Sequence, residues 1–278
     1  MKVRKFIART WVDVAALVLI GIVFVVPFVF IFLTAAKTSA EAALFQFSWP
    51  GQFQLLENIR DVLTFGNNRM FLAMWNSIVL TVGSVTLIVL LSALVAFVMQ
   101  RRGDRTAAAF SSILLAGLIL PPAVVPTIFL LQGLGLYKTL PGLILVEVAF
   151  QLPFATLVLR AFMSAIPREI DEAAIIDGAS PRQVFFSVIL PLLKPAIVTV
   201  IVVSAVFIYN DFTLPLYFLP GSQNVTVQLT LYSFMSQFTS RWNLLFADVV
   251  FITLPPLIMF LFFQRQIVEG MTTGAIKG

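Results

Sequence analysis

The sequence predicts an all-α integral membrane protein with six transmembrane helices, and the first reason is its composition. Of the 278 residues, 60% are hydrophobic and 11% are charged, whereas a soluble domain has about 45–50% apolar and about 25% charged residues. A soluble globule of this size has too few polar residues to cover so much apolar surface. The apolar runs are also continuous, without the alternation expected in strands of a membrane β-barrel.

Six stretches are long and apolar enough to cross a bilayer core of about 30 Å, which takes roughly 20 helical residues. They predict helices at 12–34, 74–99, 108–131, 141–163, 195–217 and 244–264. Two of these stretches contain prolines, Pro121, Pro122 and Pro126 in the third and Pro255 and Pro256 in the sixth. We expect each of these proline clusters to kink its helix.

The lysines and arginines predict the orientation. Thirteen of the 18 lie in the two tails and in the second and fourth connections between helices. The other five lie on the opposite side and are Lys37, Arg60, Arg69, Lys138 and Arg241. Because cytoplasmic loops carry the excess of positive charge, both termini are expected in the cytoplasm and the protein in the cytoplasmic (inner) membrane.

The first helix has one alternative interpretation, a secretory signal peptide, because Ala40-Glu41-Ala42 has the small-x-small pattern of a cleavage site. Its uncharged run, Val14–Ala36, is longer than the roughly 7–15 residues of a signal h-region, so we expect an uncleaved helix. The predicted organisation is a cytoplasmic tail (1–11), a first helix with its outer loop (12–70), a transmembrane core (71–264) and a second cytoplasmic tail (265–278).

Several chemistries are excluded by missing residues. The chain has no cysteine and no histidine, which removes disulfides, zinc sites built on those residues and histidine-based triads. It also has no Gly-Lys dipeptide, which the phosphate-binding P-loop requires. We therefore expect no cofactor and no metal in this chain, and any hydrolysis of ATP on a partner.

The fourth connection, within residues 165–191, contains the clearest motif. Pro167 suits the first position of a short helix, which we expect to end at Asp177. Glu169, Asp171 and Glu172 then lie near its start, where acidic side chains are favourable. Asp177 lies at the unfavourable end, so it is expected either to meet a cation such as Arg182 or to be a solvated carboxylate.

A sharp corner is expected after this helix. Gly178 fits the residue just beyond a helix end, where a left-handed conformation is common. Ser180, Pro181 and Gln183 have the pattern of a capping box that begins a second helix.

This segment resembles the EAA motif of ABC-importer permease subunits. The matching residues are Glu172-Ala173-Ala174, then Gly178, then Val188-Ile189-Leu190-Pro191 at the family's spacing, with Val188 where the family usually has isoleucine. The surrounding chain, over roughly residues 10–278, is similar to the six-helix partner of the maltose-type carbohydrate uptake permeases.

The resemblance implies a type I ABC-importer transmembrane domain whose segment 167–191 carries a cytoplasmic coupling helix. The residues that would contact an ATPase subunit are Glu169, Glu172, Ala173, Ala174, Asp177, Gly178, Leu190 and Pro191. The implied partners are a second homologous permease, an ATP-binding-cassette ATPase dimer that holds ATP and Mg²⁺, an extracytoplasmic solute-binding protein and a carbohydrate. The alternative for this segment is an ordinary capped surface helix.

Acidic residues within the helices suggest a solute pathway, since exposing them to lipid is costly. Glu147 could line such a path or make a structural hydrogen bond. Tyr209, Asn210 and Asp211 resemble a polar-aromatic cluster of the sugar branch, and could instead anchor the helix at the interface. The alternative function is an ion-coupled secondary transporter or channel that uses Glu147, Asp211 and Asp248.

Overall fold

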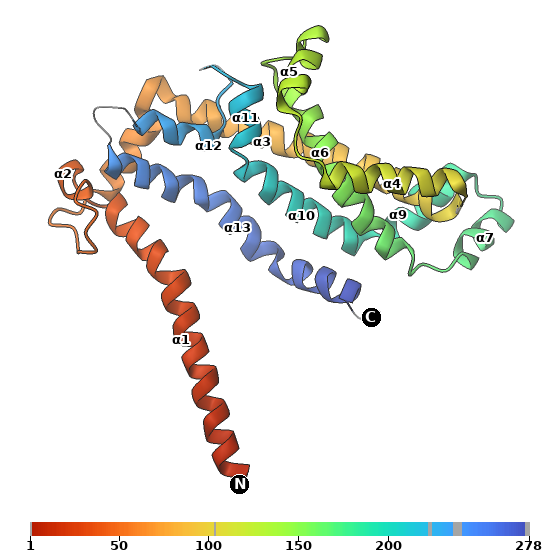
Figure 1. Ribbon diagram of the computed structural model, residues 1–278, viewed down its shortest axis with the longest axis horizontal. Coiled ribbons are helices and arrows are strands. Elements are labelled where there is room, and N and C mark those ends of the chain that lie inside the picture. Colours follow the sequence, from red (N-terminus) through yellow and green to blue (C-terminus); the bar gives the residue numbers. More distant parts are fainter. Residues whose placement is uncertain (1, 103, 222–223, 236–240, 276–278) are drawn as a thin grey trace. The chain divides into compact units, whose positions relative to one another are not determined.

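The computed structural model describes residues 2–102, 104–221, 224–235 and 241–275, which form helices and connecting loops without any strand (Figure 1). The chain divides into two compact units. Unit 1 comprises residues 1–71 and 230–254, and unit 2 comprises residues 72–229 and 255–278. Two long helices, α3 (Leu55–Arg102) and α13 (Trp242–Ala275), contribute residues to both units.

Four helical segments in the described residues are long and apolar enough to cross a membrane. They are Ala16–Ala35 in α1 (Lys2–Ala35), Arg69–Arg102 in α3, α6 (Leu140–Met163) and Trp242–Gln264 in α13. Two further candidate spans are bent pairs of shorter helices, and the count reaches six only if each pair is one span. The pairs are Arg105–Ile119 with Val124–Gly133 and Pro181–Leu192 with Lys194–Asn210.

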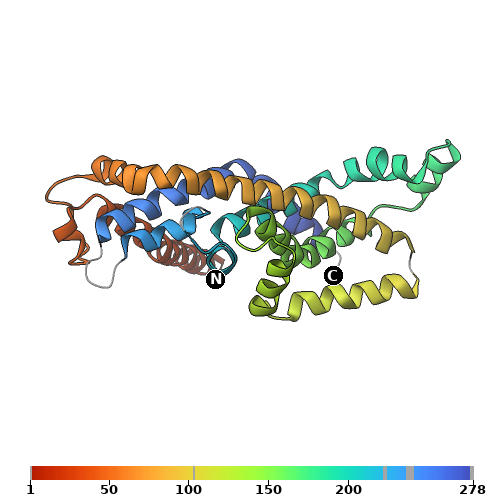
Figure 2. The ribbon, with the colours of Figure 1, turned by 90° about the horizontal axis from the view of Figure 1, so that it is seen from above.

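The third predicted span is broken rather than kinked. It consists of α4 (Arg105–Ile119) and α5 (Val124–Gly133), which are bent by 112° relative to each other. Figure 2 shows this turn where the yellow ribbon becomes green. Leu120 is extended (φ −71°, ψ 133°), because a following proline disfavours the helical conformation of the residue before it. The single helix predicted at 108–131 is therefore wrong.

The fifth predicted span also ends earlier than expected. Helix α10 (Lys194–Asn210) stops before Asp211, whose backbone is extended, and α11 (Thr213–Phe218) follows as a separate helix. The carboxylate Oδ1 of Asp211 accepts hydrogen bonds from the backbone N–H groups of Thr213 (2.8 Å) and Leu214 (3.4 Å). Because this side chain satisfies the N-terminal amides of α11, it favours a break over the continuous helix predicted to residue 217.

The outer segments contain more helix than predicted. After α2 (Ser39–Ala42) the chain enters α3 at Leu55, so the predicted second helix begins 19 residues before its expected start at 74. The last outer segment contains α12 (Val227–Thr230) and the 3₁₀-helix η2 (Leu231–Phe234). At the other end, α13 retains both of its prolines and continues to Ala275, into the predicted tail.

Unit 1 is held together by a buried polar centre. Asn58 of α3 is 3% exposed, and its side-chain amide donates to the carbonyl oxygens of Ala35 (2.8 Å) and Lys37 (2.9 Å) at the end of α1. Its Oδ1 accepts from Nδ2 of Asn243 in α13 at 2.8 Å. Asn58 thus joins three helices and satisfies orphan carbonyls at the end of α1, which would otherwise be costly to bury.

Unit 2 is centred on α6, which packs against α4, α10 and α11 (Figure 1). Small residues allow α3 and α4 to approach α6 closely: a Cβ at Gly83 of α3 would lie 2.9 Å from Cδ1 of Ile144, and one at Gly117 of α4 would lie 3.4 Å from Cγ of Pro153. Tight packing through small residues is typical of helices in membranes. It places the inner faces of α6 and α10 around the cavity described below.

Candidate coupling segment and solute cavity

The helix of the fourth connection is α7 (Glu169–Ile176). The prediction that it starts at Pro167 is wrong, because Pro167 precedes the helix and Arg168 is its N-cap residue, whose carbonyl accepts the first bond, from the N–H of Glu172 at 3.1 Å. Its three acidic residues therefore all lie in the first turn, where the helix dipole favours them.

The end of α7 has the predicted corner. Gly178 has φ +87°, a left-handed conformation that glycine adopts without steric cost. The N–H of Ala179 donates to the carbonyl of Ala174 and that of Gly178 to the carbonyl of Ile175, both at 2.9 Å. This pair of bonds is a Schellman motif, which ends a helix and redirects the chain.

The capping box is also confirmed at the start of α8 (Pro181–Gln183). Ser180 accepts from the N–H of Gln183, and Oε1 of Gln183 accepts from the N–H of Ser180 at 2.8 Å. A π-helix, η1 (Val184–Ile189), and then α9 (Leu190–Leu192) continue from it. No sequence pattern predicted the π-helix, whose wide turn places Val184, Phe185 and Ile189 in the core.

The inner face of α7 is fixed by an ion pair that sequence reasoning missed. Asp171 is 9% exposed and receives the guanidinium of Arg101, at the end of α3, through two contacts: Nε–Oδ2 at 2.5 Å and Nη2–Oδ1 at 3.1 Å. Arg101 also donates to the carbonyl of Ile166 at 3.5 Å. The arginine therefore connects the end of a transmembrane helix to α7.

The opposite face of α7 is open. Glu169, Glu172 and Ala173 are exposed, and Ile176 is 85% exposed. Asp177 is exposed too and forms no ion pair with Arg182; in the described part of the chain the ion pair is that of Arg101 with Asp171. An apolar side chain flanked by carboxylates on a short helix is a surface that a partner protein could cover.

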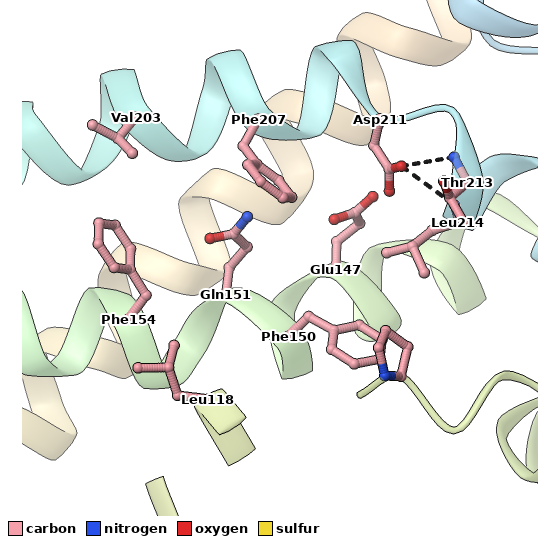
Figure 3. Close-up of a pocket in the computed structure, with 11 residues that line it drawn as sticks. Leu118, Glu147, Phe150, Gln151, Phe154, Val203, Phe207, Asp211, Thr213 and Leu214 are labelled. Carbon is pink, nitrogen blue, oxygen red and sulfur yellow. Dashed lines mark hydrogen bonds between the residues drawn. The ribbon is translucent and has the colours of Figure 1, made fainter. Parts of the chain in front are cut away.

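A second site is a cavity of about 550 Å³ in unit 2 (Figure 3). Its wall is formed by α6, by α10 with the start of α11, and by the end of α4. The lining residues are Leu118, Pro122, Glu147, Phe150, Gln151, Phe154, Val203, Phe207, Asp211, Thr213 and Leu214. The cavity thus lies where two of the predicted spans are interrupted.

Two carboxyl groups meet at one place in the wall of this cavity. Figure 3 shows the side chain of Glu147, from α6, directed toward Asp211 at the end of α10. Glu147 is 0% exposed, and its carboxyl lies within hydrogen-bonding reach of that of Asp211, so the two acids can share one proton. The cavity therefore unites two of the four residues predicted for a solute path.

The other predicted pathway residues lie outside this cavity. The buried Tyr209 directs its hydroxyl to Sδ of Met74 in α3 (3.7 Å), and Asn210 donates to the carbonyl of Val206 (2.9 Å). Asp248 belongs to unit 1, where its Oδ2 accepts from the hydroxyl of Thr230 (2.8 Å). The described residues contain no cluster of three acidic side chains that could hold a metal ion.

Comparison with known families decides the class of protein. Residues 88–273, which include the cavity, α7 and the corner after it, match the family described as binding-protein-dependent transport system inner membrane component. The chain belongs to this family. It is therefore a permease, the membrane component of an ABC transporter.

Individual relatives of the permease agree with this assignment. The diacetylchitobiose uptake system permease of Streptomyces coelicolor is 32% identical over 99% of this chain and 90% of its own length. The melibiose/raffinose/stachyose import permease of Bacillus subtilis is 30% identical over 73% of this chain and 75% of its own. These relatives are transport permeases rather than enzymes, as expected for this chain.

The fold of the permease is also found in a solved structure. A chain of a bacterial ABC transporter that imports the acidic polysaccharide alginate superposes with a TM-score of 0.82, at 20% sequence identity, over 94% of this chain and 97% of that one. The predicted fold class, a type I importer transmembrane domain, is confirmed at the level of the fold.

Proposed function

We propose that this permease carries a carbohydrate across the cytoplasmic membrane in an ATP-driven importer. Relatives whose names specify a carbohydrate solute include permeases for diacetylchitobiose, for melibiose, raffinose and stachyose, and for trehalose. The solute-facing groups in this proposal are Glu147 and Asp211 in the cavity, whereas Tyr209 and Asn210, which were predicted for the same path, lie outside the cavity.

The observation that carries the ATP-driven part of the proposal is the exposed face of α7. This helix lies within residues 88–273, the part of the chain that matches the transport family. We infer that this face binds an ATPase subunit, and that the contact is made by Glu169, Glu172, Ala173, Ala174, Asp177, Gly178, Leu190 and Pro191. Glu172 would meet a cation of the ATPase, while Ile176 would enter an apolar depression. The Schellman corner and the capping box support this role because they hold a short helix in place that would be unstable alone.

The remaining partners follow from the same proposal. Two ATPase subunits bind ATP and Mg²⁺ and hydrolyse the nucleotide, a second homologous permease completes the pathway, and an extracytoplasmic solute-binding protein delivers the sugar. Closure of the ATPases moves α7, and the helices of the permease alternate access to a central path. Both termini, α7 and the end of α3 lie on the cytoplasmic side.

The decisive experiment compares charge reversal on α7 with charge reversal elsewhere. Glu172→Lys should abolish uptake and detach or uncouple the ATPase while the subunit still inserts, and Gly178→Pro should do the same because proline fixes φ near −65° where the corner needs +87°. Asp61→Lys, an exposed acid on α3 in unit 1, is the matched control and should transport normally. Normal transport by both α7 variants would refute the coupling role.

A vesicle experiment separates ATP-driven from ion-driven transport. With ATP present and ion gradients collapsed, uptake should continue at its full rate. Loss of uptake under these conditions would favour the ion-coupled alternative built on Glu147, Asp211 and Asp248.

A further inference from the structure

The ionisable side chains that line the cavity in unit 2 are both acidic. Its lining contains two carboxyl groups, one amide from Gln151 and one hydroxyl from Thr213, while the other lining residues are apolar or aromatic (Figure 3). Lysine and arginine are absent from these lining residues. A cavity of 300–1,000 Å³ with an apolar wall and a few fixed polar groups is typical of a small-molecule site.

Glu147 is the group that most requires a ligand. It is completely buried and faces another acid, Asp211; one shared proton can join the two carboxyls, which leaves the second oxygen of Glu147 without a donor in the described part of the chain. A buried acceptor without a donor loses the hydrogen bonds that water would have given it. The chemistry missing from this site is therefore a hydrogen-bond donor or a positive charge.

Asp211 is held in a fixed position by the backbone. Its Oδ1 accepts from two amides at the start of α11, those of Thr213 and Leu214. This cap fixes the carboxyl at the point where α10 ends, and α4 ends at the same cavity. Interrupted helices that direct polar groups into a cavity are how many transporters build solute sites within the membrane.

We propose that this cavity binds a sugar through hydroxyl or ammonium groups donated to Glu147 and Asp211, and that the same pair rejects sugars that carry a carboxylate. This inference rests on the proposed function as a carbohydrate permease. Hydroxyl and ammonium groups supply the missing donors, and the C–H faces of a sugar ring can pack on Phe150 and Phe154. A sugar carboxylate would bring a third acidic group beside two others, with no cation in the lining to compensate.

Three disaccharide probes that differ in charge test the proposal. They are neutral N,N′-diacetylchitobiose, chitobiose with two ammonium groups, and digalacturonic acid with two carboxylates. Binding is measured by equilibrium dialysis against the complete transporter in lipid nanodiscs, without the solute-binding protein, so that selectivity arises from the membrane subunits. We expect digalacturonic acid to bind at least tenfold more weakly than the other two probes.

Two double variants then assign the selectivity to this pair. Glu147→Gln with Asp211→Asn should strengthen the binding of digalacturonic acid at least tenfold and weaken that of chitobiose. Glu57→Gln with Asp61→Asn removes two exposed acids from unit 1 and should change neither. If the cavity variant does not assemble with its partners, the probe series on the unaltered complex still tests the inference.

The outcomes distinguish the inference from the proposed function. If digalacturonic acid binds the unaltered complex as tightly as diacetylchitobiose, or if the cavity variant keeps the original selectivity, the inference is wrong while a carbohydrate permease stands. If none of the three probes binds, the inference is also wrong, and if uptake is in addition not driven by ATP, the proposed function itself fails.

Discussion

The ion pair between Arg101 and Asp171 should be essential for holding α7 against the end of α3. Its side chains are only 15% and 13% exposed and meet through two contacts. Removing one partner from a buried pair costs about 3–5 kcal/mol, and the partial exposure here moves the expected loss to about 2–3 kcal/mol. For a protein of this size each kcal/mol lowers the melting temperature by about 2–4 °C, so Asp171→Asn or Arg101→Gln should lower it by about 4–12 °C.

A double-mutant cycle isolates the interaction from other effects of each substitution. We expect a coupling energy of about 2 kcal/mol, the scale of a hydrogen bond between charged groups. The exchanged pair, Arg101→Asp with Asp171→Arg, should recover part of the stability, and each single variant should also transport less sugar per ATP hydrolysed. A coupling energy below about 0.5 kcal/mol, with transport per ATP unchanged in the single variants, would refute the reasoning.

Two further predictions concern polar side chains that hold helix ends. Asn58→Ala breaks three hydrogen bonds in the buried centre of unit 1 and should cost about 2–4 kcal/mol, seen as a lower melting temperature, and an unchanged melting temperature would contradict that role. The pKa of Asp104 is lowered chiefly because its carboxylate accepts a hydrogen bond from the N–H of Ala107 at the start of α4. Because the pKa of Asp104 is lower in the folded state, its contribution to stability should be present above about pH 4 and lost as the pH falls further. The free energy of unfolding, measured from pH 6 to pH 3, should therefore fall less for Asp104→Asn than for the unaltered protein. An identical fall would refute this reasoning.

The sequence was most informative where the interacting residues are close to one another in the chain. The corner at Gly178 and the capping box at Ser180 and Gln183 each involve residues within a few positions of one another, so their spacing was enough to predict them. The long apolar runs likewise identified the α1, α3, α6 and α13 spans because the bilayer sets a minimum helix length.

Sequence reasoning was weakest where distant segments meet or where one side chain ends a helix. Arg101 counted only as an orientation signal, and nothing near it indicated that Asp171, 70 residues later, would be its partner. Asp211 was read within a continuous helix because hydropathy does not register a side chain that caps the helix after it. In the predicted pathway cluster, Tyr209 and Asp211 are only two positions apart, yet the helix directs one to Met74 and the other into the cavity.

The break between α4 and α5 has a consequence for how the membrane is sealed at this place. At 1.5 Å per residue, α4 is about 22 Å long and α5 about 15 Å, so neither alone crosses a hydrocarbon core of about 30 Å. Pro121 and Pro122 have no N–H, so the carbonyls of Gly117 and Leu118 lack their helical donors. Lipid tails cannot supply those donors. The donors for these two carbonyls must therefore come from neighbouring protein or from water at membrane depth. A substitution that admits more water at this short stretch would raise ion leakage without touching a charged residue.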